Sequence, residues 1–225
     1  MMKTPAYLVL ILMIFTGLGC SSDDAVESQV QVPNIQFAQS SFTTTFRTAG
    51  ATLAPNIDWN GEQGTLTLAT PVSGVSLNQS TGVISWSKLL PIGTTTVQLI
   101  ASNSAGQSQV TLNLENDFEG SFVGAYGSDP DSQDTSNYFQ VNFSADGSVE
   151  VIANDSRDVA TGTYGLVGST LTAFYSYDFE DLNEYTFQAE LVNTAAQATV
   201  DGLWYIGDST DPADAGGYFE VSTSD

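Results

Sequence analysis

Three acidic segments of the chain carry side chains that could bind a metal ion. Calcium takes about six to eight oxygen ligands, and loops rich in Asp and Gly can wrap around it. None of the segments has the EF-hand spacing, which places a glycine at the sixth position and a glutamate at the twelfth. Each could equally be a solvated turn, so we expect no required cofactor, with calcium as the ion to test. The segments are 129–134 with Asp129, Asp131 and Asp134, 178–184 with Asp178, Glu180, Asp181 and Glu184, and 208–216 with Asp208, Asp211 and Asp214.

Most catalytic chemistries lack their usual residues in this chain. Histidine is absent, and Cys20 is the only cysteine. Because histidine is the commonest general base and metal ligand, serine–histidine catalysis and most transition-metal sites are excluded. No G-x-S-x-G nucleophile motif occurs. Paired carboxylates could hydrolyse a glycosidic bond, but no pair is marked as buried and opposed. We therefore predict that the protein is not an enzyme.

The charge of the chain limits its partners. It has 26 Asp and Glu against four Lys and Arg, which gives a formal net charge of −22. Such a chain repels phosphate backbones, so we expect no nucleic-acid partner. It attracts cations, although the same acidity also fits plain solubility.

Aromatic side chains are the other candidates for ligand contacts, because a ring offers a flat apolar face. Trp59 lies among Asn and Asp residues in a segment expected to be a loop, so it is the best candidate for stacking on a sugar ring. Tyr126 and Tyr205 are the further candidates for a ligand site. Core packing is the competing interpretation, and it is strongest for Trp86 and Trp204, which lie in alternating segments.

The elements that position these residues are predicted to be β-strands. Only 13% of the residues are charged, and no helical period of apolar residues follows Leu18. Thr, Ser, Gly, Val, Phe and Tyr are abundant, which is typical of an all-β protein. The length allows two domains of about 85 to 110 residues each. We place them at residues 33–116 and 117–225.

The first domain has many short strands separated by turns. The clearest strand is 95–103, in which Val97, Leu99 and Ala101 occupy one face. Short strands joined by such turns predict a β-sandwich. The expected strands are 34–37, 42–46, 51–53, 65–69, 74–77, 82–86, 95–103 and 107–114.

The second domain is predicted to have eight sequential strands. Alternation is regular, as in Phe139, Val141 and Phe143. Sequential hairpins close most simply into an up-and-down barrel. In such a barrel the three acidic segments would all lie at the same rim. A second sandwich is the alternative. The pattern is similar to that of bacterial lipocalin-like barrels. The expected strands are 118–126, 138–144, 148–153, 160–167, 170–177, 184–191, 197–206 and 216–222.

The N-terminal region predicts export and a lipid anchor. Lys3 precedes an apolar run at 6–18, which as a helix spans about 20 Å and is too short for the ~30 Å membrane core. Residues 1–20 therefore predict a signal peptide. The sequence GLGC, ending at Cys20, resembles the lipobox of bacterial lipoproteins, although Gly17 replaces the usual leucine. The resemblance implies acylation of Cys20, whereas a chance cysteine after an ordinary signal peptide is the alternative.

A polar tether at residues 21–32 follows. Its first residues, SSDD, resemble a tag that directs lipoproteins of some Gram-negative bacteria to the outer face of the outer membrane. That resemblance implies a surface location, with the periplasmic face as the alternative.

Residues 74–86, GVSLNQSTGVISW, resemble the G-L-x-x-N-x-x-T-G-x-I-S hairpin of Ig-like and dystroglycan-type cadherin-like domains. Pro91, Gly93 and residues 97–106 match the segment P…G…V-x-A-x-N-x-x-G of the same family. The resemblance covers residues 33–116 and implies a seven-stranded sandwich that serves as a spacer or adhesion module.

Cadherin-like domains often bind calcium between domains. For this chain the resemblance implies Glu115, Asp117 and Glu119 as ligands at the junction. A matching acidic motif upstream is missing, so a polar linker is the alternative.

These observations together predict a non-enzymatic, lipid-anchored surface protein that binds a ligand or mediates adhesion. Resemblance to surface lipoproteins that place Ig-like modules before a glycan-binding domain makes a glycan the first ligand to test, with another surface protein as the alternative partner. Two other functions stay open: a carrier that holds a small apolar molecule in the barrel, and a structural subunit of a surface complex. An interior filled by aromatic side chains would count against the carrier.

Overall fold

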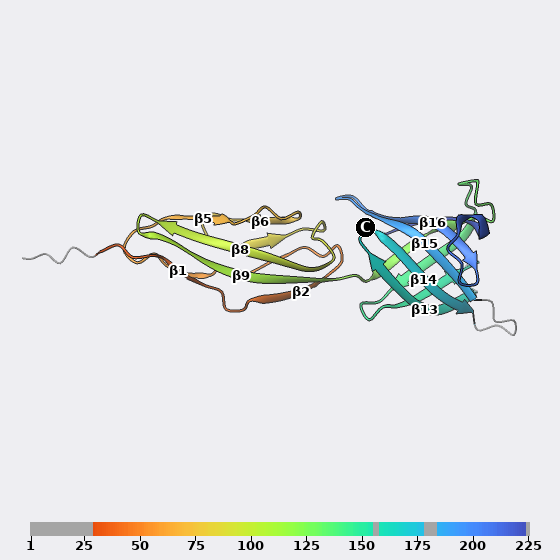
Figure 1. Cartoon of the computed structure of the whole chain (residues 1–225), viewed down its shortest axis with the longest axis horizontal. Coiled ribbons are helices and arrows are strands. Elements are labelled where there is room, and N and C mark those ends of the chain that lie inside the picture. Colours follow the sequence, from red (N-terminus) through yellow and green to blue (C-terminus); the bar gives the residue numbers. More distant parts are fainter. Residues whose placement is uncertain (1–28, 155–157, 178–183, 224–225) are drawn as a thin grey trace, which may run out of the picture.

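The computed structural model describes residues 29–154, 158–177 and 184–223. The first half of the chain forms an elongated body of packed sheets, and the second half forms a closed barrel at its end (Figure 1). The prediction of an all-β protein with an eight-stranded antiparallel barrel and separate sheets is confirmed. Among the described residues, no helix has the length and apolar character needed to cross a membrane.

The described part of the first half contains nine strands in three sheets. The larger sheet has the order β2-β9-β8-β5, the smaller one β3-β7-β6, and β1 pairs with β4. Strand β2 runs parallel to β9, and the other pairs are antiparallel. The strands are β1 (Asn34–Gln36), β2 (Ser41–Thr45), β3 (Gly50–Ala51), β4 (Asn56–Asp58), β5 (Thr65–Leu68), β6 (Val75–Leu77), β7 (Ile84–Trp86), β8 (Gly93–Asn103) and β9 (Gly106–Asp117).

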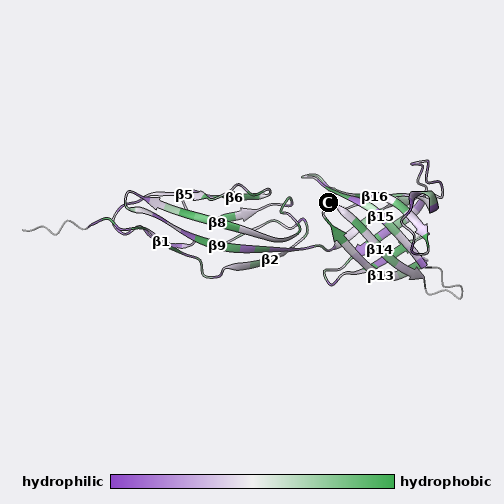
Figure 2. Cartoon of the chain, in the orientation of Figure 1, coloured by the Kyte–Doolittle hydropathy of each residue, from purple (hydrophilic) through white to green (hydrophobic). Residues whose placement is uncertain are grey.

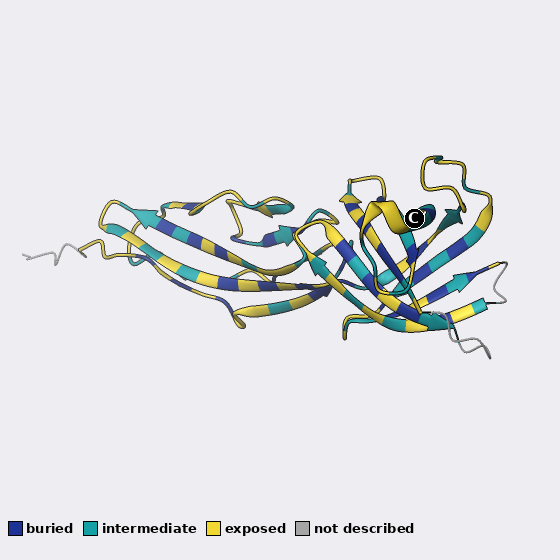
Figure 3. Cartoon of the chain, turned by 45° about the vertical axis from the view of Figure 1, so that its right-hand side comes forward, coloured by how far each residue is buried: buried dark blue, intermediate teal, exposed yellow. Residues whose placement is uncertain are grey.

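Alternation along β8 and β9 builds the core of this half. Val97, Leu99, Leu112 and Leu114 are completely buried, while their neighbours in sequence face outward (Figure 3). All eight expected strands of this half are present, and β4, which pairs with β1, is a ninth; the seven strands that the family resemblance implied are too few. Strand β4 lies in a segment expected to be a loop, since Ile57 is its only apolar side chain.

The predicted hairpin at residues 74–86 joins β6 and β7. The Oδ1 atom of Asn78 accepts hydrogen bonds from the backbone N–H groups of Ser80 and Thr81, at 3.0 and 3.2 Å. Gly82 follows with a φ of 74°, a conformation that glycine adopts without strain. These contacts fix the turn that the sequence pattern indicated.

The barrel is closed by pairing between its first and last strands, β10 and β17. Every strand places alternate residues inside, so apolar and polar bands alternate along the ribbons (Figure 2). The strands are β10 (Gly120–Tyr126), β11 (Asn137–Phe143), β12 (Ser148–Ala153), β13 (Asp158–Val167), β14 (Thr170–Tyr177), β15 (Glu184–Asn193), β16 (Ala198–Ile206) and β17 (Ala215–Thr223), with the short 3₁₀-helix η1 (Pro212–Asp214) before β17.

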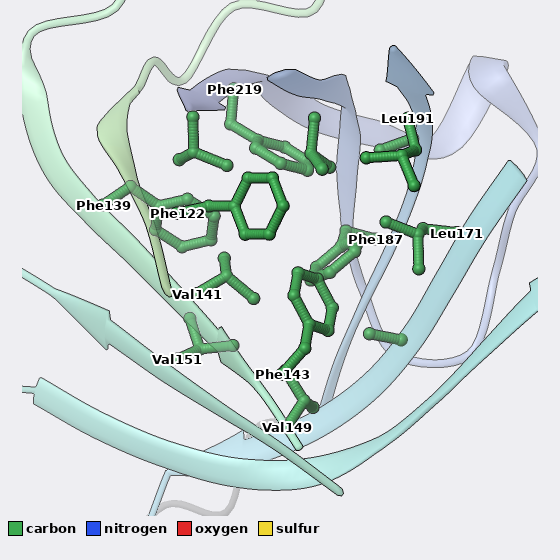
Figure 4. Close-up of a cluster of buried hydrophobic side chains, with 14 of the residues drawn as sticks. Phe122, Phe139, Val141, Phe143, Val149, Val151, Leu171, Phe187, Leu191 and Phe219 are labelled. Atoms are coloured by element: carbon green, nitrogen blue, oxygen red, sulfur yellow. The ribbon is translucent and has the colours of Figure 1, made fainter. Parts of the chain in front are cut away.

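The middle of the barrel is filled by side chains. Five phenylalanine rings point into it and pack against valine and leucine side chains (Figure 4). Neighbouring ring centroids lie about as close as 5.1 Å, the separation between Phe187 and Phe219. The five are Phe122, Phe139, Phe143, Phe187 and Phe219.

The end of the barrel nearest the first half is closed by Phe46, which directly follows β2. Its side chain is only 7% exposed and belongs to the barrel core, with its ring centroid 5.0 Å from that of Phe118 and 6.4 Å from that of Phe122. The Phe46 N–H donates to the carbonyl of Asp117 at 2.8 Å. Phe46 of the first half is therefore part of the second core, and Ile92 of the first half packs against that core.

Arg47 also links the first half to the barrel. Its guanidinium donates to the Oδ1 atom of Asn193 at 2.8 Å and to the carbonyl oxygens of Thr194 and Ala196 at 2.7 and 2.9 Å, in the turn between β15 and β16. The Asn193 side chain in turn donates to the carbonyl oxygen of Lys88 at 2.9 Å. We refer to the Phe46 side chain in the end of the barrel as the plug, and to the plug and these contacts together as the joint.

Candidate functional site

A groove of about 280 Å³ lies on the outer face of the barrel, beside strands β13, β14 and β15. Phe174 stands in it with 48% of its surface exposed, which is unusual for a phenylalanine. The outward residues around the ring bear hydroxyl or carboxylate groups. We call this site the Phe174 groove; its lining residues are Thr161, Gly162, Thr163, Phe174, Tyr175, Ser176, Glu184, Tyr185, Thr186, Gly207 and Asp208.

Strand register explains how the groove is built. Phe174 pairs with Thr163 on one side and with Thr186 on the other, so two hydroxyl-bearing residues flank the ring. Ser176 and its partners Thr161 and Glu184 form the next row toward the rim. These side chains share the outer face because the residues between them point into the barrel.

One wall of the groove comes from the segment after β16. The Thr186 hydroxyl donates to the carbonyl of Gly207 at 2.6 Å, and the Gly207 N–H donates to the carbonyl of Glu184 at 2.7 Å. These bonds place Asp208 beside the start of β15. The exposed carboxylates of Glu184 and Asp208 therefore belong to one side of the groove.

Backbones beneath Phe174 approach each other closely at Gly162. A Cβ atom at that position would lie 1.9 Å from the carbonyl oxygen of Phe174 and 2.7 Å from the Cα atom of Tyr175. Only glycine can occupy this site without moving β13 away from β14. Gly162 thus sets the position of the strand that carries the exposed ring.

The barrel mouth at the end away from the joint is lined with tyrosines. Tyr175 and Tyr185 are stacked with centroids 5.7 Å apart, and Tyr177 meets Tyr185 edge to face at 5.4 Å. Burial raises the pKa values of Tyr175 and Tyr177 well above the ordinary value, and neighbouring tyrosines and Asp158 add to the shift for Tyr177. These hydroxyls stay neutral at physiological pH, so they can only offer neutral hydrogen bonds.

The predicted ligand residue Tyr126 lies in this mouth. Its hydroxyl donates to the Oδ1 atom of Asn154 at 2.9 Å. Its ring meets that of Trp204 edge to face, with the ring centroids 6.2 Å apart. Burial is the main reason that its pKa is raised, and the hydrogen bond to Asn154 opposes the shift. The structure therefore brings Tyr126 close to Trp204 and the other mouth tyrosines.

The other two predicted aromatic residues are less accessible than expected. Trp59 is half-buried and packs on the first-half core, with Gly64 directly beneath its ring. Tyr205 is only 1% exposed on the outer face of β16, so its ring offers no surface to a ligand from solvent. Burial raises its pKa, with a further contribution from Asp211 in the segment that precedes β17.

The predicted calcium residues at the junction lie along β9 and just after it. Glu115 and Asp117 are exposed opposite β2, whereas the intervening Asn116 is buried and donates to the carbonyl of Leu90 at 2.8 Å. Glu119 is half-buried between β9 and β10. The polar run thus alternates between the two faces of the strand.

The two acidic loops that the structure describes, at 129–134 and 208–216, open at the same end of the barrel, as predicted (Figure 1). Asp129, Asp131 and Asp134 are all exposed, and the Oδ1 atom of Asp129 accepts the N–H of Asp131 at 3.0 Å. Across the described ranges, no three Asp, Glu or Cys side chains are gathered as a metal site would require. Asp178, Glu180, Asp181 and Cys20 lie outside the described residues.

Sequence reasoning missed Phe174, although a signal for it exists. Leu171, Ala173, Tyr175 and Tyr177 form the inward series of β14, which leaves Phe174 on the outward series with threonine and serine. A large aromatic residue out of phase with the core pattern indicates an exposed ring.

No protein-family model matches the chain, and no curated protein matches its sequence. Among solved structures, a quinonprotein alcohol dehydrogenase-like protein from Bacteroides thetaiotaomicron is similar over 77% of this chain, with 11% identity and a TM-score of 0.29. The match covers 57% of that protein, so the chain spans little more than half of its length. A similarity this distant assigns neither a family nor a function.

Proposed function

We propose that the protein is a non-enzymatic, lipid-anchored cell-surface binding protein whose barrel binds a glycan in the Phe174 groove. The observation that carries the proposal is an exposed aromatic ring set among hydroxyl groups and bounded by carboxylates. A sugar ring has an apolar face of C–H groups and an edge of hydroxyls. Phe174 can stack on the former, while Thr161, Thr163 and Ser176 can hydrogen-bond with the latter.

The proposal requires no cofactor. Calcium at the acidic loops is a separate expectation, which adding a chelator during the binding measurement tests directly. The first half of the chain serves as the spacer that separates the barrel from the anchor. Contact with another surface protein through the same exposed face is an alternative for the partner.

A carrier of small apolar molecules is the second candidate, and a different cavity favours it. The phenylalanine-filled barrel interior counts against a ligand there. At the joint, however, lies a cavity of about 460 Å³, and none of its described lining residues is ionisable; they are Phe46, Ser73, Leu89, Leu90, Pro91, Ile92, Gly168, Ser169, Leu191 and Asn193. Its size is in the range of small-ligand pockets.

Replacing Phe174 by alanine is expected to abolish glycan binding without unfolding the barrel. The ring is half in solvent, so the loss of packing is small, whereas its stacking surface disappears. We expect affinity for the bound glycan to fall at least about tenfold. The measurement is a glycan array, followed by calorimetric titration of the best glycan, with the chain from Ser21, which keeps both halves whole.

Val167→Ala is the matched control, because Val167 is 83% exposed on the same barrel but lies outside the groove. Binding that survives Phe174→Ala would move recognition elsewhere. If the array shows no glycan at all, the carrier takes precedence.

Replacing Cys20 by alanine in the full chain is expected to release the protein from membranes. Acyl chains contribute about 0.8 kcal/mol per buried methylene, so their loss removes the anchor. Labelling with an alkyne-tagged fatty acid should mark the parent chain, which has Cys20, and should not mark the alanine variant. Added protease should digest the parent chain on intact cells. Persistent membrane association of the alanine variant would contradict the lipid anchor, and protease resistance on intact cells would favour the periplasmic face.

A further inference from the structure

We infer that the Phe174 groove selects glycans that carry a protonated amino group over neutral and acidic ones. This inference rests on the proposed function and adds the class of ligand to it. It follows from the charges that surround the ring, from their placement in adjacent segments of the groove lining, and from the location of the basic side chains that the structure describes.

The carboxylic acids among the described lining residues are Glu184 and Asp208, and none of these described lining residues is basic. Glu184 and Asp208 are exposed, and the backbone bond from Gly207 to Glu184 at 2.7 Å ties their segments together. The two carboxylates therefore come from adjacent segments of the groove lining.

The basic residues that the structure describes lie at the opposite end of the barrel. Arg47 contacts the turn after β15, and the backbone of Lys88 accepts a hydrogen bond from Asn193 in the joint. The Phe174 groove includes Glu184 at the start of β15 and Asp208 just after β16, so it lies near the rim with the acidic loops. Glu184 and Asp208, the charged side chains among the described lining residues, therefore give the groove a negative potential, in keeping with the charge of −22 for the whole chain.

An amino sugar complements this arrangement at two points. Its C–H face stacks on Phe174, and its ammonium group donates to Glu184 or Asp208 in charge-assisted hydrogen bonds. An ammonium within about 6 Å of the ring also gains from the negative face of the aromatic system. Uronic acid or sulfate groups would meet like charges in the same position and be repelled.

Two oligosaccharides with the same backbone test this preference. The hexamer of β-1,4-linked glucosamine carries amino groups, whereas the hexamer of β-1,4-linked N-acetylglucosamine is neutral. Titration of the chain from Ser21 at about pH 6, where the sugar amines are protonated, should show roughly tenfold tighter binding of the amino hexamer. Glu184→Gln and Asp208→Asn should each reduce that ratio about threefold, and Phe174→Ala should abolish binding of both hexamers.

Glu190→Gln is the charge-matched control, since Glu190 is exposed on the same outer face of β15 but outside the groove. An effect of Glu190→Gln as large as that of Glu184→Gln would overturn the inference, because attraction would then come from net charge alone. Equal affinity for the two hexamers would also overturn it and leave glycan binding intact. No Phe174-dependent binding of any glycan would overturn the proposed function and the inference together.

Discussion

Phe46→Ala is expected to destabilise the barrel more than the sheets to which Phe46 is attached in sequence. The ring is 7% exposed and contacts Phe118 and Phe122, so its removal leaves a cavity at the closed end of the barrel. Truncation of a buried phenylalanine costs about 3–5 kcal/mol in free energy of unfolding. Since small domains are stable by only about 5–15 kcal/mol, this is a large fraction of the total.

Hydrogen exchange resolved by segment measures where the loss falls. Peptides from β10, β11 and β17 should exchange faster in Phe46→Ala, while peptides from β8 keep their protection. Phe42→Ala is the control, because Phe42 is a half-buried residue of the neighbouring strand β2 that packs on the first-half core. Its ring centroid lies 6.0 Å from that of Trp86. Faster exchange confined to β8 and β9 in Phe46→Ala would contradict the assignment of Phe46 to the barrel.

Gly162→Ala is expected to destabilise the barrel and weaken the Phe174 groove together. The new methyl group would lie 1.9 Å from a backbone oxygen, which cannot rotate away as a flexible side chain can. Overpacking of this kind costs about 3 kcal/mol. Because the oxygen belongs to Phe174, relief of the clash must shift the residue that presents the ring. Chemical denaturation and titration with the best glycan measure the two effects.

Gly165→Ala provides a control three positions further along the same strand. A Cβ atom at Gly165 meets nothing within 4 Å, so this variant should be as stable as the parent or up to about 1 kcal/mol more stable. Equal losses for both glycine variants would show that chain entropy, and not the close approach of β13 and β14, governs the response.

The barrel could be predicted from the sequence because its inward positions follow a strict alternation. Val141 and Val151 fall on the same face by counting alone, and every expected strand of this half is present in the closed barrel. In the first half the shortest strands carry too little pattern. Strand β4 has Ile57 as its only apolar residue, so its sequence does not indicate a strand. It is a strand because it pairs with β1.

The candidate site was harder to predict, because exposure depends on tertiary contacts. Tyr205 lies on an outward position of β16, yet the segment that leads to β17 covers it. The alternation along the strand therefore could not predict that Tyr205 is buried. Conversely, the spacing of Asp129, Asp131 and Asp134 resembles a ligand set, but spacing does not fix the direction of side chains in a loop. Phe174 differs from both, since its phase alone separates it from the core.

The plug at the joint constrains how this protein could have diversified. Modular proteins evolve by recombining domains at linkers, and here the obvious crossover point lies near Asp117, at the end of β9. A barrel transferred from that point would lose Phe46 and the Arg47 contacts, because both residues precede it by about seventy positions. The two halves should therefore be inherited as one block, and a recombinant with a foreign stalk would need an aromatic residue supplied from that stalk to close the barrel.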